Sequence, residues 1–343
     1  MTDLMPPTDR PTPTPAGGAA RTDATARTDH VPPVVLGAMN FGTRQDDAAS
    51  FALLDAYVAA GGVWIDTADC YAFWNDPSGH GGQSEPVLGR WLAARPGVRE
   101  RVLIATKVGC EPLWPGSFPE RSTGLGADVV RRVAAQSLDR MGLDRIDLLW
   151  AHRDDRGTDL AEVVEAFGGL VADGTVRRWG WSNTALWRVE RSAGLARAAG
   201  LAAPSALQLK YSYLQPRPMV RDRVHEHRFG WLTDDVLDYA ATDPAVDLWA
   251  YSPLMHGSYE RGDRPRPEAF DHPGTTRRLA ALAEVAAELG TGRTAVVLAW
   301  LAGGSPRVLP IAGVSTLDQL ATAMAGVRLV LPPELRARLD DAW

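Results

Sequence analysis

Four side chains of this 343-residue chain could together protonate a reacting oxygen atom: those of Asp66, Tyr71, Lys107 and His152. A tyrosine hydroxyl has an ordinary pKa of about 10, and a nearby ammonium group lowers that pKa because it stabilises the phenolate. We expect Lys107 to provide this ammonium group and Asp66 to be its counter-ion. We expect His152 to hydrogen-bond and orient the reacting oxygen. This chemistry suits a carbonyl group that is protonated while a separate donor delivers a hydride.

Each of these side chains stands at or shortly after the end of a short apolar segment. Asp66 ends the segment VWID, Lys107 ends VLIATK, and His152 follows IDLLW with one residue between. Tyr71 lies in the loop that follows Asp66. In a barrel of parallel strands the carboxyl ends of all strands open on one face, where barrel enzymes carry their catalytic residues. We therefore expect the four side chains to meet at one rim.

From residue 34 onward the chain repeats one unit, in which a short β-branched apolar segment is followed by a loop and a segment with helical spacing. Strands are predicted at 34–37, 63–66, 102–107, 146–150, 176–181, 206–211, 247–251 and 308–311. Helices are predicted at 45–60, 84–94, 128–141, 158–173, 186–199, 233–242, 276–289 and 316–325. This alternation predicts an α/β fold with parallel strands, and eight units predict a (β/α)8 TIM barrel. The alternative is a doubly wound open sheet, which normally carries a G-x-G-x-x-G turn after its first strand, and VVLGAMNFG lacks that turn.

The composition is that of a globular protein, with 45% hydrophobic and 23% charged residues. We expect a single barrel domain over residues 31–343, preceded by a disordered tail rich in Pro and Thr at residues 1–30. The tail lacks the apolar region of a signal peptide and carries several Asp residues, which transit peptides avoid. Because no other apolar segment reaches membrane-spanning length, we expect a cytoplasmic protein with no membrane partner. A net charge of −6 argues against nucleic acid as a partner.

The two cysteines, Cys70 and Cys110, are predicted to be free thiols, as expected in a reducing compartment. Cys70 directly precedes Tyr71, and we interpret it as an inert, partly buried thiol. The sequence His-Glu-His at 225–227 offers two histidines at i and i+2 without further ligands, and we interpret it as a solvated loop. No metal site is predicted.

Eight segments of the chain resemble the aldo-keto reductase family, in the order in which that family carries them. They are LGAMNFG (36–42), DTADCY (66–71), ATKVG (105–109), DLLWAHRDD (147–155), GTVRRWGWSN (174–183), LQLKYSYL (207–214), YSPLMHG (251–257) and LPIAGVSTLDQL (309–320). The resemblance implies the same barrel, with Tyr71 as general acid and base and with Asp66, Lys107 and His152 completing a catalytic tetrad. It also implies a nicotinamide cofactor held extended across the barrel mouth.

The resemblance assigns the contacts to this cofactor by position. The implied residues are Met39, Asn40 and Phe41 beside the nicotinamide ribose; Ser182, Asn183 and Gln208 on the carboxamide; Tyr211 stacked on the nicotinamide ring; Ser252, Pro253, Leu254 and Gly257 near the pyrophosphate; and Gly313, Ser315 and Gln319 at the adenosine end. At the adenosine end, the N-terminus of the helix predicted at 316–325 can receive a phosphate.

The resemblance favours NADP(H) as the cofactor, with NAD(H) left open. Members of the family often carry a Lys or Arg at the adenosine end to bind the 2′-phosphate, whereas this chain has Gly-Val-Ser-Thr there. Ser315 and Thr316 can still donate hydrogen bonds, and Arg261, Arg264 or Arg266 could add positive charge from the preceding loop. We therefore expect only a modest preference for NADP(H).

Aromatic side chains crowd three loops at the predicted mouth of the barrel. They are Phe73 and Trp74 after the second strand, Trp114 and Phe118 after the third, and Tyr259 and Phe270 after the seventh. Clustered aromatic rings are typical of a pocket for a sizeable, partly apolar ligand. We expect Phe73, Trp74, Trp114 and Phe118 to line the substrate pocket.

We therefore predict an oxidoreductase that reduces an aldehyde or ketone, aromatic or sugar-like, to an alcohol, or oxidises the alcohol in the reverse direction. The partner is a small-molecule carbonyl compound or alcohol, the hydride comes from the nicotinamide, and the proton comes from Tyr71. One alternative is a reductase of an imine or an activated C=C bond on the same scaffold. Another is a regulatory subunit that binds the cofactor and turns over slowly. The oligomeric state stays open, and a monomer is compatible with the sequence.

Overall fold

The structure, a computed structural model, describes residues 34–218, 230–243 and 245–343 of the chain. The predicted N-terminal tail, residues 1–30, lies outside the described residues, and so does the His-Glu-His sequence at 225–227.

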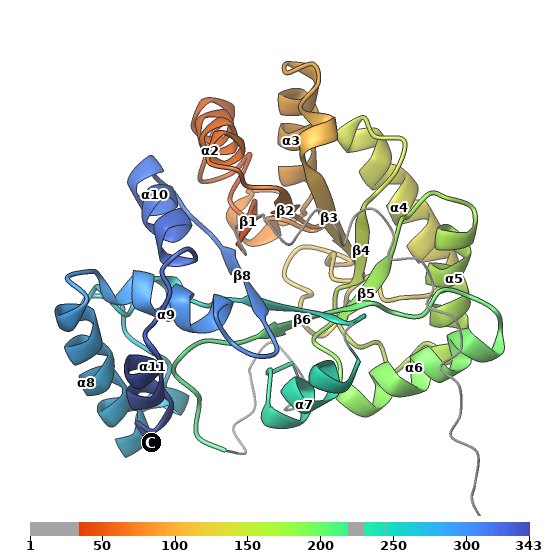
Figure 1. Cartoon of the computed structure of the whole chain (residues 1–343). Coiled ribbons are helices and arrows are strands. Elements are labelled where there is room, and N and C mark those ends of the chain that lie inside the picture. Colours follow the sequence, from red (N-terminus) through yellow and green to blue (C-terminus); the bar gives the residue numbers. More distant parts are fainter. Residues whose placement is uncertain (1–33, 219–229, 244) are drawn as a thin grey trace, which may run out of the picture. The chain divides into compact units, whose positions relative to one another are not determined.

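Eight parallel strands pair in chain order and close into a barrel, in which β8 pairs with β1 (Figure 1). The strands are β1 Val35–Gly37, β2 Trp64–Asp66, β3 Leu103–Val108, β4 Leu148–Ala151, β5 Trp179–Ser182, β6 Ala206–Lys210, β7 Asp247–Tyr251 and β8 Val308–Ala312. All eight strands lie where the sequence predicts them, with ends that differ by up to three residues. The (β/α)8 barrel is therefore confirmed, and the doubly wound sheet is wrong.

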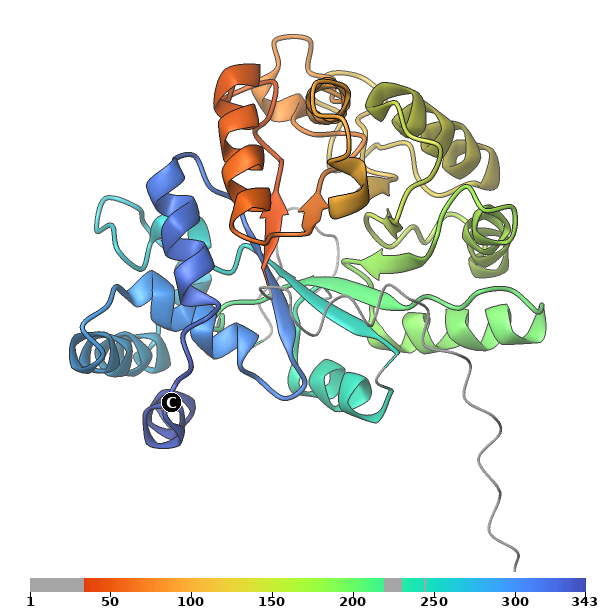
Figure 2. The same cartoon turned by 45° about the horizontal axis from the view of Figure 1, so that its top comes forward.

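Helices surround the barrel as an outer ring (Figure 2). They are α2 Asp47–Ala59, α3 Ser84–Ala93, α4 Ala127–Met141, α5 Leu160–Ala172, α6 Leu186–Ala198, α7 Asp234–Thr242, α8 Pro273–Glu288, α9 Arg293–Ala302, α10 Leu317–Gly326 and α11 Pro333–Asp340. At the N-termini of several helices, a short polar side chain accepts a hydrogen bond from a backbone N–H that has no partner within the helix. Asp46 accepts from the amide of Ala49 at 2.8 Å before α2, and Asp159 accepts from the amide of Ala161 at 2.7 Å before α5.

Helices α9 and α11 are absent from the predicted set. In α9, residues 295–302 are all buried, so the helix is apolar on every side and shows no alternation of apolar and polar faces. In α11 the apolar signal is limited to Leu335 and Leu339, one turn apart in a short polar segment. Both helices pack in one apolar cluster with α8, and α9 lies beside β8.

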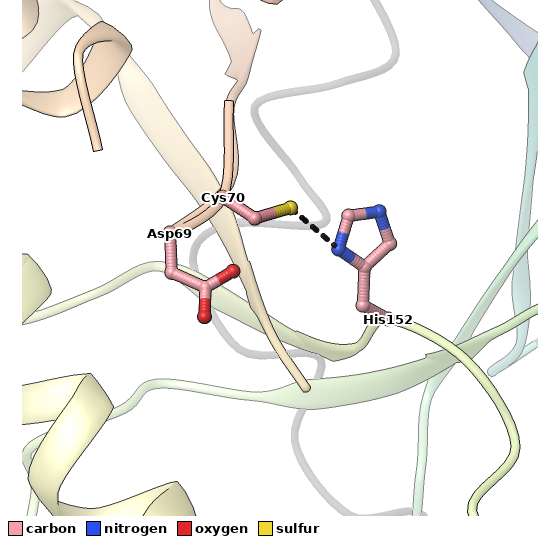
Figure 3. A group of neighbouring side chains, drawn as sticks. All are labelled: Asp69, Cys70 and His152. Carbon is pink, nitrogen blue, oxygen red and sulfur yellow. Dashed lines mark hydrogen bonds between the residues drawn. The ribbon is translucent and has the colours of Figure 1, made fainter. Parts of the chain in front are cut away.

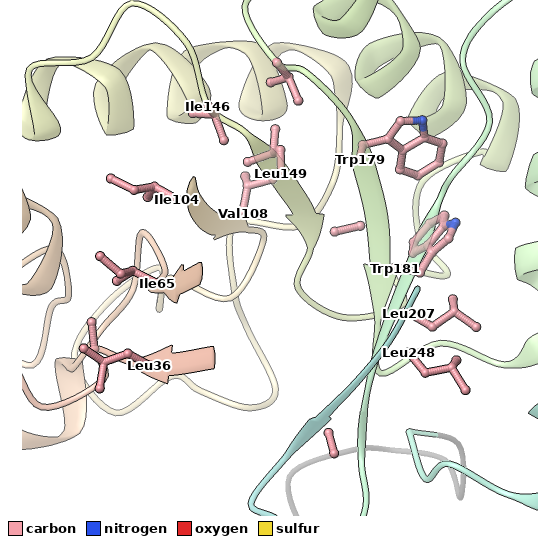
Figure 4. Close-up of a cluster of buried hydrophobic side chains, with 14 of the residues drawn as sticks. Leu36, Ile65, Ile104, Val108, Ile146, Leu149, Trp179, Trp181, Leu207 and Leu248 are labelled. Carbon is pink, nitrogen blue, oxygen red and sulfur yellow. The ribbon is translucent and has the colours of Figure 1, made fainter. Parts of the chain in front are cut away.

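The outer core lies between the strands and the helices (Figure 4). Side chains alternate along a strand, so every second residue points outward. Trp179 on β5 stacks against Phe167 of α5 with ring centroids 5.0 Å apart, and the indole N–H of Trp181 donates to Ser192 of α6 at 2.9 Å. These contacts fix the outward face of β5, and with it the inward direction of Gly180 and Ser182.

Three tryptophans fill much of the barrel interior. The ring of Trp249 meets Trp64 and Trp150 edge to face, with centroids 5.1 Å and 5.2 Å apart. The tryptophans fit because small residues face them: a Cβ at Gly180 would lie 2.8 Å from the Trp150 ring. Packed side chains thus fill the barrel interior below the carboxyl ends of the strands.

Among the described residues, no single helix is both long and apolar enough to cross a membrane. Helices α8 and α9 meet the length and composition criteria only as a pair, and they are bent by 100° relative to each other.

Candidate active site

A buried ion pair lies at the carboxyl end of the barrel interior. Strand alternation directs Asp66, Lys107 and Gln208 inward at the ends of β2, β3 and β6. The ammonium Nζ of Lys107 donates to Oδ2 of Asp66 at 2.5 Å and to the backbone oxygen of Thr67 at 2.8 Å. The amide of Gln208 donates to Oδ1 of Asp66 at 2.9 Å. The carboxylate therefore has a partner on each oxygen, and the predicted pairing of Lys107 with Asp66 is present.

Tyr71 lies next to this ion pair. Nζ of Lys107 is 4.7 Å from the centroid of the Tyr71 ring, and the His152 ring meets it edge to face at 5.8 Å. The backbone carbonyl of Tyr71 accepts hydrogen bonds from the amides of three successive residues at the start of α3, Gly82, Gln83 and Ser84. The first turn of α3 thus holds the loop that carries the hydroxyl. The structure brings all four predicted tetrad residues together.

Burial is the largest cause of the pKa shifts of Tyr71 and Asp66. It raises the pKa of Tyr71 well above its ordinary value, and the negative charge of Asp66 raises it further. Burial also raises the pKa of Asp66, although Lys107 and Gln208 oppose this by stabilising the carboxylate. The net shift of the Tyr71 pKa is therefore upward, opposite to the direction that sequence reasoning expected from Lys107. Since Asp66 neutralises the ammonium at 2.5 Å, little positive charge is left to stabilise the phenolate.

His152 is held from two sides. Its Nδ1 lies 3.6 Å from the thiol sulfur of Cys70, and its backbone oxygen accepts from the Asn183 amide at 2.9 Å. Asn183 has a left-handed backbone (φ 52°), and its side-chain oxygen accepts from the hydroxyl of Tyr251 at 2.8 Å. Sequence reasoning missed Tyr251, although its position at the end of β7 matches the rim positions on the other strands.

The three residues expected on the carboxamide lie beside the tetrad. Ser182 accepts from the Asn183 amide at 3.0 Å, and Gln208 contacts Asp66 as described. Both amide hydrogens of Asn183 are therefore engaged within the protein, on Ser182 and on the backbone of His152. A cofactor carboxamide that binds here would share or replace these hydrogen bonds.

A cavity of about 310 Å³ opens beyond the end of β6. It is lined by Lys210, Ser212, Trp231, Ser252, Met255, His256, Arg264, Pro265, Pro267 and Phe270. Lys210 follows Gln208 by two residues on the same face of β6, so the cavity begins one inward position beyond the residue that contacts Asp66. Burial lowers the pKa of His256, and the charges of Lys210 and Arg264 lower it further.

Sequence reasoning placed Ser252 in the cofactor site, and it lines this cavity. Ser252, Met255 and His256 have left-handed backbones, which turn the chain back over the end of β7 (φ 47–56°). The carbonyl of Pro253 accepts from the Ser212 hydroxyl at 2.6 Å, and Leu254 packs against the core. Gly257 ends the short helix Met255–Gly257. Tyr211, at the other side of this turn, lies 5.7 Å from the ring of Trp300.

The remaining residues expected to bind the cofactor lie at a second place on the rim, beside β1 and β8. Phe41 is completely buried, whereas Asn40 has a buried side-chain oxygen with no hydrogen-bond partner in the part of the chain that the structure describes. Met39 precedes them in the same turn. The Gln45 amide donates to the backbone of Val314 at 3.3 Å, which joins this turn to the loop after β8.

At the start of α10, side chains of the same segment already accept hydrogen bonds from the backbone amides. Gln319 accepts from the amide of Ser315 at 2.8 Å, and its own amide donates to the Thr316 hydroxyl at 3.2 Å. The arrangement resembles a capping box, except that Gln319 accepts the amide of the residue before the N-cap, and the two bonds occupy donors that a phosphate would use. Gly313 is exposed beside it, and Asp318 adds a negative charge to the first turn. The charge for a phosphate must therefore come from elsewhere.

Three of the four residues predicted for the substrate pocket form one aromatic wall beside Tyr71. Phe73 contacts Trp74 and Phe118, with ring centroids 4.8 Å and 5.1 Å apart, and Trp74 lies 5.8 Å from the Tyr71 ring. The guanidinium of Arg153 lies 5.8 Å from the Phe118 ring and was missed by sequence reasoning.

The other aromatic residues of these loops do not join the wall. Trp114 is 54% exposed, and no ring contact links it to the wall within residues 34–218, 230–243 and 245–343. Tyr259 is a core residue, because it is 2% exposed and its hydroxyl bonds Ser212 and the Leu214 amide. Phe270 is buried but lines the cavity beyond β6.

Comparison with known proteins gives consistent matches over the whole barrel. Residues 33–343 match the Aldo/keto reductase family. The uncharacterized oxidoreductase YrpG of Bacillus subtilis is 30% identical, over 90% of this chain and 91% of its own length. Norsolorinic acid reductase A of Aspergillus parasiticus is 28% identical, over 91% of this chain and 78% of its own. An aryl-alcohol dehydrogenase [NADP(+)] of Phanerodontia chrysosporium is 30% identical, over 91% and 82%.

Proposed function

The chain belongs to the aldo/keto reductase family, and on that premise we propose that this oxidoreductase uses NADP(H) to reduce an aromatic aldehyde or ketone to the alcohol. The observation that carries the proposal is the position of the Tyr71 ring, which lies against Lys107 on one side and His152 on another at the barrel mouth. A proton donor so placed faces the space where barrel enzymes bind their substrates.

Tyr71 acts as the general acid. Because burial raises its pKa, the hydroxyl keeps its proton at neutral pH and can donate it to the carbonyl oxygen as negative charge develops there. Asp66 offsets much of the ammonium charge of Lys107, 4.7 Å from the ring centroid, and the remainder stabilises part of the charge that the tyrosine oxygen gains during the transfer. Asp66 and Gln208 position that ammonium, and His152 orients the carbonyl oxygen.

The residues at the rim fit a nicotinamide dinucleotide. When bound, the cofactor supplies the hydride that reduces the carbonyl carbon. Ser182, Asn183 and Gln208 offer the hydroxyl and amide groups that a carboxamide requires, next to the tetrad. The buried, unpaired side-chain oxygen of Asn40 offers an acceptor for a ribose hydroxyl.

The cavity beyond β6 fits the phosphate groups of the cofactor. Arg264 and Lys210 bring positive charge close enough to lower the pKa of His256. Phosphate oxygens bind such side chains strongly, since each hydrogen bond is charge-assisted. Both cofactors carry the pyrophosphate, so this charge supports NADP(H) over NAD(H) through a contact of Arg264 with the 2′-phosphate, whereas the start of α10 gives no comparable support.

The aromatic wall supports an aromatic substrate. Phe73, Trp74 and Phe118 present ring faces and edges beside the proton donor, and Trp74 is still 46% exposed. A planar ring can cover that exposed surface and gain both apolar burial and ring contacts. Two relatives agree with this, because one is named for the reduction of norsolorinic acid and another for the oxidation of aryl alcohols.

The test is the rate of NADPH oxidation by purified protein with matched substrates. A benzaldehyde, an aryl ketone, a short aliphatic aldehyde, a cyclic imine and an enone should be compared at equal concentrations, with the product identified by chromatography. We expect the aryl carbonyl compounds to be reduced with the highest kcat/KM. A faster reaction of the imine or the enone, with no alcohol formed from the aldehydes, would contradict the proposal.

A further inference from the structure

Three side chains with metal-binding atoms meet behind Tyr71 (Figure 3). Asp69 and Cys70 lie in the loop after β2, and His152 follows β4, 82 residues later than Cys70. The thiol sulfur, a ring nitrogen of the imidazole and a carboxylate oxygen all lie within 4.8 Å of one another. The figure shows the thiol directed at the imidazole, with the carboxylate beside them.

The carboxylate of Asp69 is the unusual member of this group. The residue is 4% exposed, and neither of its side-chain oxygens has a hydrogen-bond partner among the described residues. Burying a polar group without a partner costs free energy, and buried carboxylates normally pair with donors or bind metals. Asp69 therefore has unused bonding capacity beside a thiol and an imidazole.

The spacing matches a tetrahedral metal site. A zinc ion bound to sulfur at about 2.3 Å and to nitrogen at about 2.0 Å would place these two ligand atoms about 3.5 Å apart. The sulfur of Cys70 lies 3.6 Å from Nδ1 of His152. An oxygen of Asp69 lies within 4.8 Å of both other ligand atoms, so movement of this side chain would provide the third ligand, and solvent would provide the fourth.

We propose that Asp69, Cys70 and His152 form a binding site for a zinc-like divalent cation. One thiolate, one imidazole and one carboxylate form a ligand set of intermediate softness, which suits zinc and cobalt better than magnesium or calcium. Binding replaces the S–H bond of Cys70 with a metal–sulfur bond, and the proton is released to the buffer.

The charge around the site favours a cation. Glu111 accepts the amide of Gly81 with both carboxylate oxygens, at 3.0 Å and 3.1 Å. Gly81 packs directly on the backbone of Cys70, because a Cβ there would lie 2.3 Å from the Cys70 carbonyl carbon. A second carboxylate thus lies close to the thiol. The positive charges nearest the site are both paired, Lys107 with Asp66 and Arg140 with Glu85.

Metal binding would act on the reductase through His152. A cation on Nδ1 leaves Nε2 as the only ring nitrogen that can face a substrate, and it draws the ring toward Asp69. Because the ring orients the reacting oxygen in the proposed mechanism, occupancy should lower turnover. This consequence rests on the proposed function, whereas binding itself does not.

The test is a cobalt titration of the full chain, prepared without a polyhistidine tag and stripped of metal with a chelator. We expect one cobalt ion per chain, with a thiolate-to-cobalt charge-transfer band that zinc abolishes by displacement. Cys70→Ala should remove the band. Cys110→Ala is the matched control, since Cys110 is a buried thiol in the same apolar cluster, and it should keep the band.

Further variants separate this site from other ligands of the chain. Asp69→Asn should weaken cobalt binding by at least roughly 10- to 100-fold, which is the typical loss when a residue that only supports a metal ligand is removed. The double variant His225→Ala/His227→Ala should bind as the wild type does. Circular dichroism tests whether each variant is folded. If Cys70→Ala is not folded, Cys70→Ser takes its place in the titration.

Three results would overturn the proposal: no charge-transfer band at stoichiometric cobalt, a band that persists in Cys70→Ala, or a band lost in Cys110→Ala. In each of these cases the 3.6 Å contact is only a hydrogen bond between the thiol and the imidazole. The absorption measurement needs no substrate, so it stands even if the protein proves inactive on aryl carbonyl compounds.

Discussion

The ammonium of Lys107 lies 2.5 Å from the carboxylate of Asp66, and both side chains are almost completely buried at the mouth of the barrel. Because burial excludes bulk solvent from both groups, each is held in one position by the other. The Tyr71 ring lies beside this pair, and the position of the proton donor therefore depends on it.

Lys107→Met should destabilise the protein, because it leaves the Asp66 carboxylate buried without a counter-ion. Removal of one partner of a buried ion pair costs about 3–5 kcal/mol. The free energy of unfolding, measured by urea denaturation, should fall by that amount. The double variant Lys107→Met/Asp66→Asn should recover part of the stability and stay inactive. A single variant as stable as the wild type would show that Asp66 is neutral in the folded protein.

The pH dependence of carbonyl reduction should follow the raised pKa of Tyr71. The acid form donates the proton, and a pKa above the ordinary value of about 10 keeps that form populated from neutral to alkaline pH. We expect kcat/KM for reduction to fall only above the ordinary tyrosine range. The reverse reaction needs the phenolate, so its rate should rise with pH over the same range. A fall of the reduction rate near neutral pH would show that another group donates the proton.

Trp74→Ala should change which substrates are accepted more than whether they react. Loss of the ring removes apolar contact with an aryl substrate, a loss of roughly 1–2 kcal/mol or about 5- to 30-fold in kcat/KM. A short aliphatic aldehyde should lose much less. Trp187→Ala is the matched control, because Trp187 is a comparably exposed tryptophan on α6. Equal losses for both substrates would indicate that Trp74 only holds its loop.

Arg264→Leu should weaken NADPH binding about tenfold, since it removes one charge-assisted contact to a phosphate. Arg261→Leu should have little effect, because Arg261 is paired with Asp263 and does not line the cavity. Quenching of tryptophan fluorescence by NADPH and by NADH measures both affinities. If Arg264→Leu leaves the NADPH affinity unchanged, the phosphates bind elsewhere, and the start of α10 becomes the next place to examine.

Sequence reasoning locates the strands and the tetrad well for a physical reason. Buried parallel strands are short β-branched segments, and a polar residue that ends such a segment has no place except the rim. Asp66 and Lys107 could therefore be identified one strand at a time, without knowledge of the packing. The same reasoning applied to β7 would have indicated Tyr251, which binds Asn183.

Features that depend on packing between distant segments could not be predicted in this way. Helix α9 is buried on all sides and has no periodic signal. The packing of the tryptophans in the barrel interior depends on the space left by Gly180. The direction of the Tyr71 pKa shift depends on burial, which the sequence does not report. Likewise, the contact of Cys70 with His152 appears only when β2 and β4 are placed in the barrel.

The central claim is that the Tyr71 hydroxyl supplies the proton. Tyr71→Phe removes one oxygen atom and leaves the ring contacts with Lys107, His152 and Trp74 in place. The measurement is the single-turnover rate of NADPH oxidation by an aryl aldehyde, with NADPH affinity and the thermal unfolding midpoint as controls. We predict a loss of about 10²- to 10⁴-fold in rate, the range typical of general acid catalysis, with both controls unchanged. A variant that is folded, binds NADPH and keeps more than about a tenth of the wild-type rate would contradict the mechanism, because it would lack the loss that general acid catalysis requires.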